Sequence, residues 1–190
     1  MATDQEVKVS EAFLRIALPH IFNDATFAVN EHITDTPRRF VQMLQQMTSP
    51  EPFEFTTFES MSDEMIVVRD IDFVSLCVHH IVPFIGKAHV GYVPRGRMVG
   101  LSKIARTVRF EAATLTVQEA LTARIANFLE LKLEPHGVAV VLEAEHMCMA
   151  LRGVKASGSV TTTSTMRGVF ADHERLARSE FLQLIGRNHG

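Results

Sequence analysis

Residues 65–94 read MIVVRDIDFVSLCVHHIVPFIGKAHVGYVP, and this stretch settles the fold class. Its beginning (65–77) and its end (83–94) are rich in β-branched and aromatic residues, and a Pro-Arg-Gly turn follows the second part. Two more strands are predicted at GVAVVLEAEHMCMALRG (137–153) and SVTTTSTMRGVF (159–170). Strands that arrive in neighbouring pairs favour an antiparallel sheet, and therefore an α+β domain rather than a parallel βαβ one.

Helices are predicted on both sides of these strands. Before residue 50, Asp35-Thr36-Pro37 is a helix start signal, with a capping side chain followed by proline. Further helices are expected to begin near Ser102 and near Thr116, and another is expected over about 172–186. A small sheet with helices on one face leaves its other face and its edges free for further subunits. We therefore expect a homo-oligomer.

Length and composition indicate one globular domain over residues 1–190, with a mainly helical part (1–50) before the sheet-containing part (51–190). The chain is 46% hydrophobic and 22% charged, and it has neither a secretory leader nor an apolar run long enough to span a membrane. A net charge of −3 gives no general attraction to nucleic acid or to an anionic membrane. Two cysteines are too few for a disulfide scaffold, so the predicted location is the reducing cytoplasm.

Both cysteines lie in clusters with histidine, CVHH (77–80) and HMCM (146–149). In a straight strand Cys77 and His80 would lie roughly 10 Å apart on opposite faces, so they can share a metal only if the backbone turns there. If the second cluster continues a strand, His146, Cys148 and Arg152 share one face. Two cysteines and one histidine match a catalytic zinc site with an open fourth position, which leaves the other histidines for proton transfer. Alternatively, these residues are ordinary core groups, and spacing alone leaves both possibilities open.

The segment GLSKIAR (100–106) is a candidate anion site. Ser102 could cap a helix whose free N–H groups bind phosphate, and Lys103 and Arg106 lie one turn apart. The alternative is a solvated basic helix start. Glu119 lies off the apolar stripe of its helix, so it is either a surface residue or a carboxylate that accepts two N–H donors from a guanine edge. Arg39, near the start of the early helix, can likewise be an ordinary surface charge.

Five stretches, taken together and in order, resemble the GTP cyclohydrolase I family: SLCVHHIVPFIGKAHVGYVP, VGLSKIARTV, VQEALT, EAEHMCMALRGV and TTTSTMRGVF. The resemblance covers all but the first thirty or so residues. It implies the tunnelling fold, an antiparallel sheet with paired helices packed on one face. It also implies a homodecamer with active sites between subunits, and conversion of GTP to 7,8-dihydroneopterin triphosphate with release of formate.

The resemblance implies a role for each matching residue. One zinc ion per subunit would be held by Cys77, His80 and Cys148. The proton-transfer residues would be His79 and His146, with Ser102 beside the ribose and phosphates. The triphosphate would be bound by Lys103, Arg106 and Arg152, with Arg39 reaching in from a neighbouring subunit. Glu119 would bind guanine, and the neighbouring Gln118 would also contact the substrate.

Three positions depart from the family pattern. Val78 stands where the family usually has glutamate, and Thr114 and Ala120 stand where it usually has arginine. We hypothesise that the missing carboxylate was the partner of a missing arginine, because losing both leaves no unpaired charge.

Two alternative functions remain. One is a cyclohydrolase that stops early or takes another purine nucleotide, and the other is a non-catalytic subunit that binds nucleotide or zinc.

Overall fold

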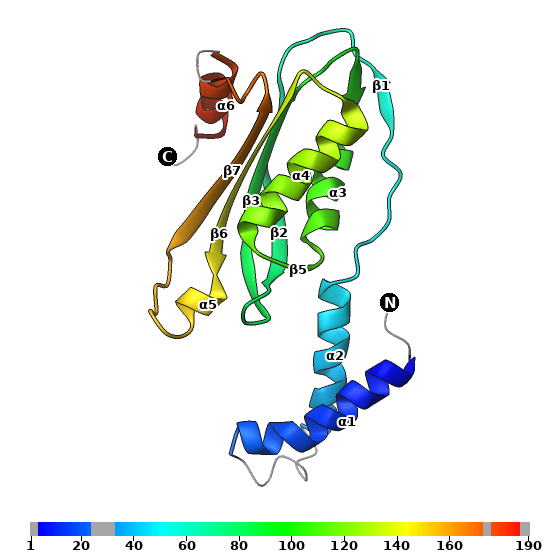
Figure 1. Cartoon of the computed structure of the whole chain (residues 1–190), viewed down its shortest axis with the longest axis vertical. Coiled ribbons are helices and arrows are strands. Elements are labelled where there is room, and N and C mark those ends of the chain that lie inside the picture. The colour runs from blue at the N-terminus through cyan, green and yellow to red at the C-terminus, as the bar shows by residue number, and fades with distance from the viewer. Residues whose placement is uncertain (1–3, 24–32, 173–175, 187–190) are drawn as a thin grey trace. The chain divides into compact units, whose positions relative to one another are not determined.

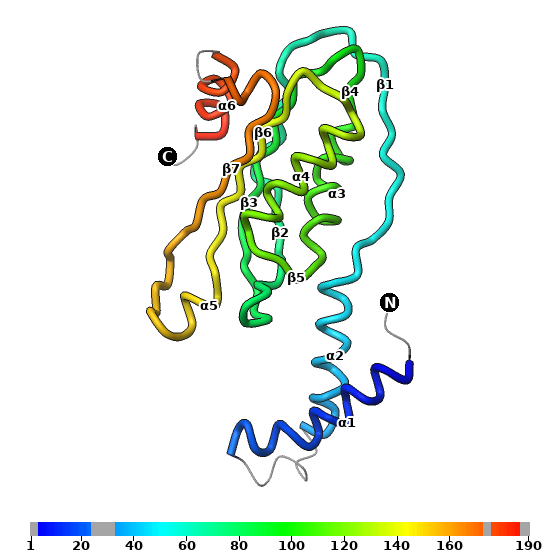
Figure 2. The backbone as a smooth tube through the Cα atoms, in the orientation of Figure 1, coloured from blue at the N-terminus to red at the C-terminus, as the bar shows by residue number. Residues whose placement is uncertain are grey.

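The structure is a computed structural model that describes residues 4–23, 33–172 and 176–186. The chain divides into two compact units, Met1–Ser49 and Pro50–Gly190 (Figures 1 and 2). The division falls next to the predicted boundary between the helical N-terminal part and the rest. That both parts act as one domain stays a prediction.

The first unit contains helices α1 (Asp4–Ile21) and α2 (Thr36–Met47), which pack against each other. α2 begins where the Asp-Thr-Pro signal predicts. The Asp35 side chain does not cap the helix, however, because its carboxylate accepts a hydrogen bond from Arg38 at 3.0 Å. A mainly apolar groove lies between the helices, with Phe13 and Phe40 among the residues that line it.

The second unit is built on a five-stranded sheet with the order β5-β2-β3-β6-β7. Four strands are antiparallel neighbours, as predicted: β2 (Ile66–Cys77), β3 (Val82–Val93), β6 (Gly137–His146) and β7 (Val160–Gly168). The fifth strand, β5 (Leu115–Thr116), was not expected, and it pairs parallel to the end of β2. A separate small sheet joins β1 (Thr57–Glu59) to β4 (Arg97–Val99). The fold class is α+β, as predicted.

Helices α3 (Leu101–Ala112) and α4 (Gln118–Leu133) cover one face of the sheet (Figure 1). Their apolar side chains, Ile104, Val108, Leu121 and Ile125 among them, form one core with sheet residues such as Val90 and Tyr92. This is the predicted arrangement of paired helices on one face.

The sequence led us to expect that the opposite face of the sheet is free, but helix α6 (Leu176–Gly186) covers part of it. This helix buries Phe181 in a second core cluster with Val141 and Phe170. Gly91 makes this contact possible, because a Cβ there would lie 2.7 Å from the Phe181 ring. Among the described residues, no helix combines the length and apolarity needed to cross a membrane.

The second Cys/His cluster corrects one expectation. The strand predicted to run to residue 153 ends at His146, and a single helical turn, α5 (Met147–Ala150), follows. Strand pairing explains this end. His146 faces Phe84 in the last β3 pair, and the preceding residue on β3, Pro83, has no N–H to donate. His146 and Cys148 therefore do not share a strand face.

Candidate metal centre and neighbouring polar groups

Two strand ends bring three potential metal ligands together. The ligand atoms of Cys77, His80 and Cys148 all lie within 4.8 Å of one another. Cys77 is buried at the end of β2, Cys148 is half-buried in α5, and His80 is exposed in the turn after β2. Among the described residues, this is the one such group of three or more His, Cys, Asp or Glu side chains.

The backbone turns after Cys77, as a shared metal required. The Cys77 carbonyl accepts hydrogen bonds from the N–H groups of His80 at 3.3 Å and Ile81 at 2.8 Å. Ile81 has a positive φ of 56°, and Val82 then begins β3. The turn brings the His80 side chain back toward Cys77, so residues three apart serve one site.

The donor set suits a zinc ion. Burial and the neighbouring Cys77 thiol raise the pKa of Cys148, because a thiolate is costly there without a positive charge. A divalent cation would supply that charge. Two cysteines and one histidine are common zinc ligands, and three protein ligands leave the fourth position open.

His146 has a fixed orientation. Its Nε2 lies 2.7 Å from Oε1 of Gln118, while the amide nitrogen of Gln118 lies 3.1 Å from the Leu142 carbonyl and 2.9 Å from that of Thr161. Carbonyl oxygens only accept, so the amide nitrogen must face them and Oε1 must accept from His146. The proton of the neutral imidazole is therefore on Nε2, and Nδ1 keeps its lone pair.

Two neighbours affect this imidazole further. The ring of Phe84 stacks on it with a centroid distance of 4.8 Å and an angle of 2°. Burial lowers the pKa of His146, and the Glu119 carboxylate opposes this in part. An oriented, neutral imidazole is suited to accept a proton.

The other residues predicted around this centre lie on exposed positions. His79 is in the turn with its Nδ1 3.7 Å from the Cys77 sulfur. Glu119 is exposed in the first turn of α4, and Arg152 is exposed just after α5. His79 and Arg152 adjoin the segments that carry the metal ligands, and Glu119 follows Gln118, the partner of His146. Gln118, predicted to contact substrate, is fully buried and bonded to His146 and to the sheet.

The predicted phosphate residues on α3 lie away from this centre. The C-terminal end of α3 leads into β5 and the metal turn, whereas Ser102 and Lys103 lie in its first turn, about 16 Å away along the axis. Ser102 is not the helix cap either, because Gly100 occupies that position. Arg106 lies one turn further along and is exposed. One chain therefore does not bring its whole predicted set together.

Arg39 belongs to the first unit and is described only there. It lies on α2, is largely exposed, and has its guanidinium 3.9 Å from the Asp35 carboxylate. A role in phosphate binding stays a prediction.

Val78, the departure in the first cluster, lies beside the 114–116 segment. Its N–H donates to the Thr116 carbonyl at 3.1 Å, and the Leu76 N–H donates to the Thr114 carbonyl at 3.4 Å. The hypothesis that the residues usual at 78 and 114 were partners is therefore compatible with the backbone. Ala120 is exposed in the first turn of α4.

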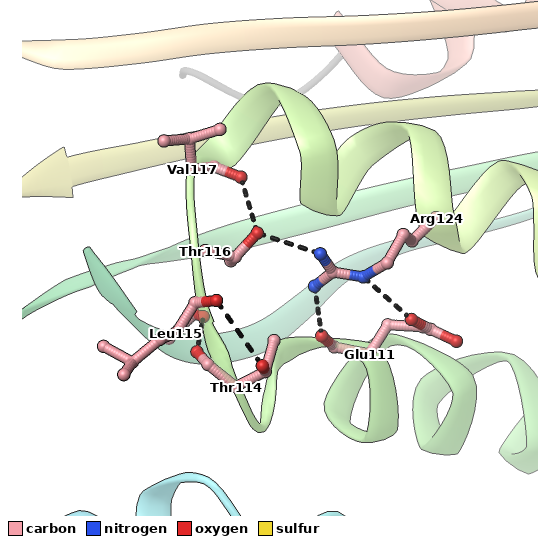
Figure 3. A network of polar contacts seen from close by, with 7 residues as sticks. Glu111, Thr114, Leu115, Thr116, Val117 and Arg124 are labelled. Atoms are coloured by element: carbon pink, nitrogen blue, oxygen red, sulfur yellow. Dashed lines mark hydrogen bonds and ion pairs between the residues drawn. The ribbon is translucent and has the colours of Figure 1, made fainter. Parts of the chain in front are cut away.

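Sequence reasoning missed two contributors near the site. Phe84 resembles any other strand residue in a hydrophobic pattern, and nothing in the sequence marks it as the partner of His146. Arg124 lies in α4 and contacts Glu111 and Thr116 (Figure 3). An arginine in an amphipathic helix usually indicates a solvated face, so its sequence context gave no signal.

Comparison with known proteins confirms the family resemblance seen in the sequence. A family model described as GTP cyclohydrolase I matches residues 19–186. A protein of Aquifex aeolicus named GTP cyclohydrolase 1 is 45% identical over 187 residues, which cover 97% of this chain and 98% of the relative. One of Sulfurihydrogenibium sp. with the same name is 47% identical over 180 residues, or 94% of each chain. A protein of Nostoc sp. named GTP cyclohydrolase 1 2 is 49% identical over 83% of this chain and 76% of its own.

Proposed function

The chain belongs to the GTP cyclohydrolase I family, and from this premise we propose that it hydrolyses and rearranges GTP to 7,8-dihydroneopterin triphosphate, with zinc as cofactor and formate as second product. The observation that carries the proposal is the convergence of Cys77, His80 and Cys148 within 4.8 Å. A catalytic zinc site needs three such ligands and a free position. His146, two residues before Cys148, adds a base.

Zinc would be held by the two cysteine sulfurs and the His80 imidazole. When bound, it supplies Lewis-acid activation of water at neutral pH. The raised pKa of the Cys148 thiol implies that metal binding releases protons, so zinc affinity should increase with pH.

Proton transfer during opening of the guanine imidazole ring falls to His146. Its Nδ1 is the acceptor, because Gln118 engages Nε2 at 2.7 Å. Two hydrolytic steps consume two waters and release C8 of the purine as formate. The ribose then opens and rearranges, and two of its carbons close a ring on the two freed amino nitrogens with loss of one water, which gives the pterin. His79 and Ser102 are proposed to assist these later proton transfers. Glu119 would accept the N–H groups of the guanine edge.

The triphosphate requires positive charge, which Lys103, Arg106, Arg152 and Arg39 would supply. Ser102 and Lys103 lie at the end of α3 remote from the chain's own metal group. This separation supports a homo-oligomer, a decamer by family resemblance, in which α3 of one subunit faces the metal group of another.

Mixing inactive variants tests the shared site. Cys148→Ser and Lys103→Ala subunits are each expected to be inactive, or nearly so. Dissociated and reassembled together, they should regain up to about a quarter of wild-type turnover, because random pairing combines both intact halves in that fraction of sites. If mixtures stay as inactive as their components after verified subunit exchange, the shared site is wrong.

The proposed reaction is tested by incubating zinc-loaded protein with GTP and following formate and pterin absorbance together. Equal amounts of both are expected, and chelator-treated protein should produce neither until zinc is restored. Formate without pterin would indicate a cyclohydrolase that stops early. Neither product, with GTP and zinc bound, would favour a non-catalytic binding subunit.

A further inference from the structure

A charged side chain from α4 braces the short strand beside the metal turn (Figure 3). The Arg124 guanidinium donates from Nε to the Glu111 carboxylate at 3.1 Å, from Nη2 to the Glu111 carbonyl at 2.8 Å, and from Nη1 to the Thr116 hydroxyl at 2.9 Å. The arginine side chain is 36% exposed and the glutamate side chain 15%. Three donors of one planar group are therefore engaged by α3 and β5 at once.

The braced strand, β5, joins the two halves of the site. Thr116 pairs with Cys77, and its carbonyl accepts the Val78 N–H at 3.1 Å, so β5 fixes the start of the metal turn. The Thr116 hydroxyl also donates to the carbonyl of Val117, the N-cap residue of α4, at 3.2 Å. Gln118 and Glu119 follow directly. A displacement of β5 would thus change the position of the metal turn relative to the guanine-binding end of α4.

β5 has few interactions of its own to hold it. It is two residues long, lies at the edge of the sheet and pairs with β2 alone. Neither Thr114 nor Ala120, the departures flanking β5, contributes a charge, and neither does Val78 across from it. The Arg124–Glu111 ion pair joins α4 to α3, the helices that follow and precede β5, and the same guanidinium bonds the Thr116 hydroxyl on β5.

We propose that Arg124 is a positioning residue for the reaction: through Thr116 and Glu111 it holds β5 in register, and thereby sets the metal turn against the first turn of α4. The inference rests on the proposed function for its catalytic consequence. A loss of alignment of about 1 Å between reacting groups can cost two orders of magnitude in rate, so a positioning residue should act mainly on kcat.

The test compares Arg124→Gln with Arg167→Gln as matched control. Arg167 also contacts α4, through Glu130 at 3.9 Å and Asn127 at 3.4 Å, but it lies on β7 and does not contact β5. Arg124→Gln is expected to lower kcat at least tenfold while KM for GTP changes less than threefold. Arg124→Lys should recover part of kcat, and Arg167→Gln should match the wild type within twofold.

A second readout does not depend on turnover. Cobalt(II) replaces zinc in Cys/His sites, and its visible absorption reports ligand geometry. In Arg124→Gln the absorption bands should shift and the Co²⁺ dissociation constant should rise about tenfold, since supporting partners of metal ligands have effects of this size. If Arg124→Gln does not fold, Thr116→Val takes its place, because it removes the hydroxyl and keeps the side-chain shape. It should shift the absorption bands and raise the Co²⁺ dissociation constant as well.

The outcomes separate this inference from the proposed function. If the wild type releases no formate from GTP, the proposed function fails and the cobalt titration alone decides the role of Arg124. If the wild type turns over GTP and the Arg124 and Thr116 variants equal it within twofold in kcat and Co²⁺ affinity, the inference is overturned. A fall in kcat that only follows a loss of folded protein, measured by circular dichroism, would overturn it as well.

Discussion

The two segments that supply the metal ligands are built differently. After Cys77 the chain makes a tight turn in which one carbonyl accepts two N–H groups, and it then returns along the neighbouring strand. After His146 it makes one turn of helix, with the Leu151 N–H bonded to the Met147 carbonyl, and only later starts β7. The first segment supplies two ligands three residues apart and the second supplies one. Ligand spacing is therefore informative only together with the local backbone.

Removing a ligand should have the largest effect, and it should differ between the segments. Cys148→Ser is expected to lose zinc, from one ion per chain to under about a tenth, and at least a thousandfold in turnover. Cys77→Ser should lose as much zinc and as much turnover. It should also have a lower Tm, because Cys77 is buried in the core whereas Cys148 is half-buried. Metal analysis, turnover and thermal unfolding check this, with Met149→Leu as control. Turnover retained in metal-free Cys148→Ser protein would refute the zinc role.

A change at the base should separate chemistry from metal binding in the second segment. His146→Ala is expected to keep one zinc per chain and to lower kcat by about two to four orders of magnitude, the usual range for general acid–base catalysis. Zinc content and single-turnover formate release are the measurements. His136→Ala, a change in the turn before β6, should leave both unaltered. Loss of zinc together with activity would instead make His146 part of the metal site.

The smallest effect concerns the backbone of the first segment. Ile81 has a positive φ, which costs a β-branched residue about 1–2 kcal/mol. Ile85, in regular strand, is similarly exposed (51% against 47%) and serves as control. Ile81→Gly should therefore reduce the free energy of unfolding by about 1–2 kcal/mol less than Ile85→Gly, measured by denaturant titration. Equal losses would show that the turn is unstrained.

The sequence predicted the fold class and the four long strands, because hydrophobic patterns act locally. It made the turn after Cys77 a condition for a shared metal, and the structure meets that condition. It did not predict where β6 ends. Alternation through Arg152 is compatible with a strand, and only the pairing partners, Pro83 among them, show that the strand stops. The sequence also did not predict the buried hydrogen bonds of Gln118, because a polar residue early in a helix is usually solvated. Contacts between distant segments leave no periodic signal.

Two requirements act on the side chain at position 84: it must fill the core, and it must cover the His146 imidazole. Its side chain is fully buried and packs against Phe73, so any large apolar residue would preserve most of the folding energy. Its flat ring also covers the His146 imidazole, which a leucine of similar volume would not do in the same way. Natural variation at this position should therefore be narrower than burial alone requires. A survey that sorted residues into those for folding and those for reactivity would count Phe84 in the first class and overlook its part in the second.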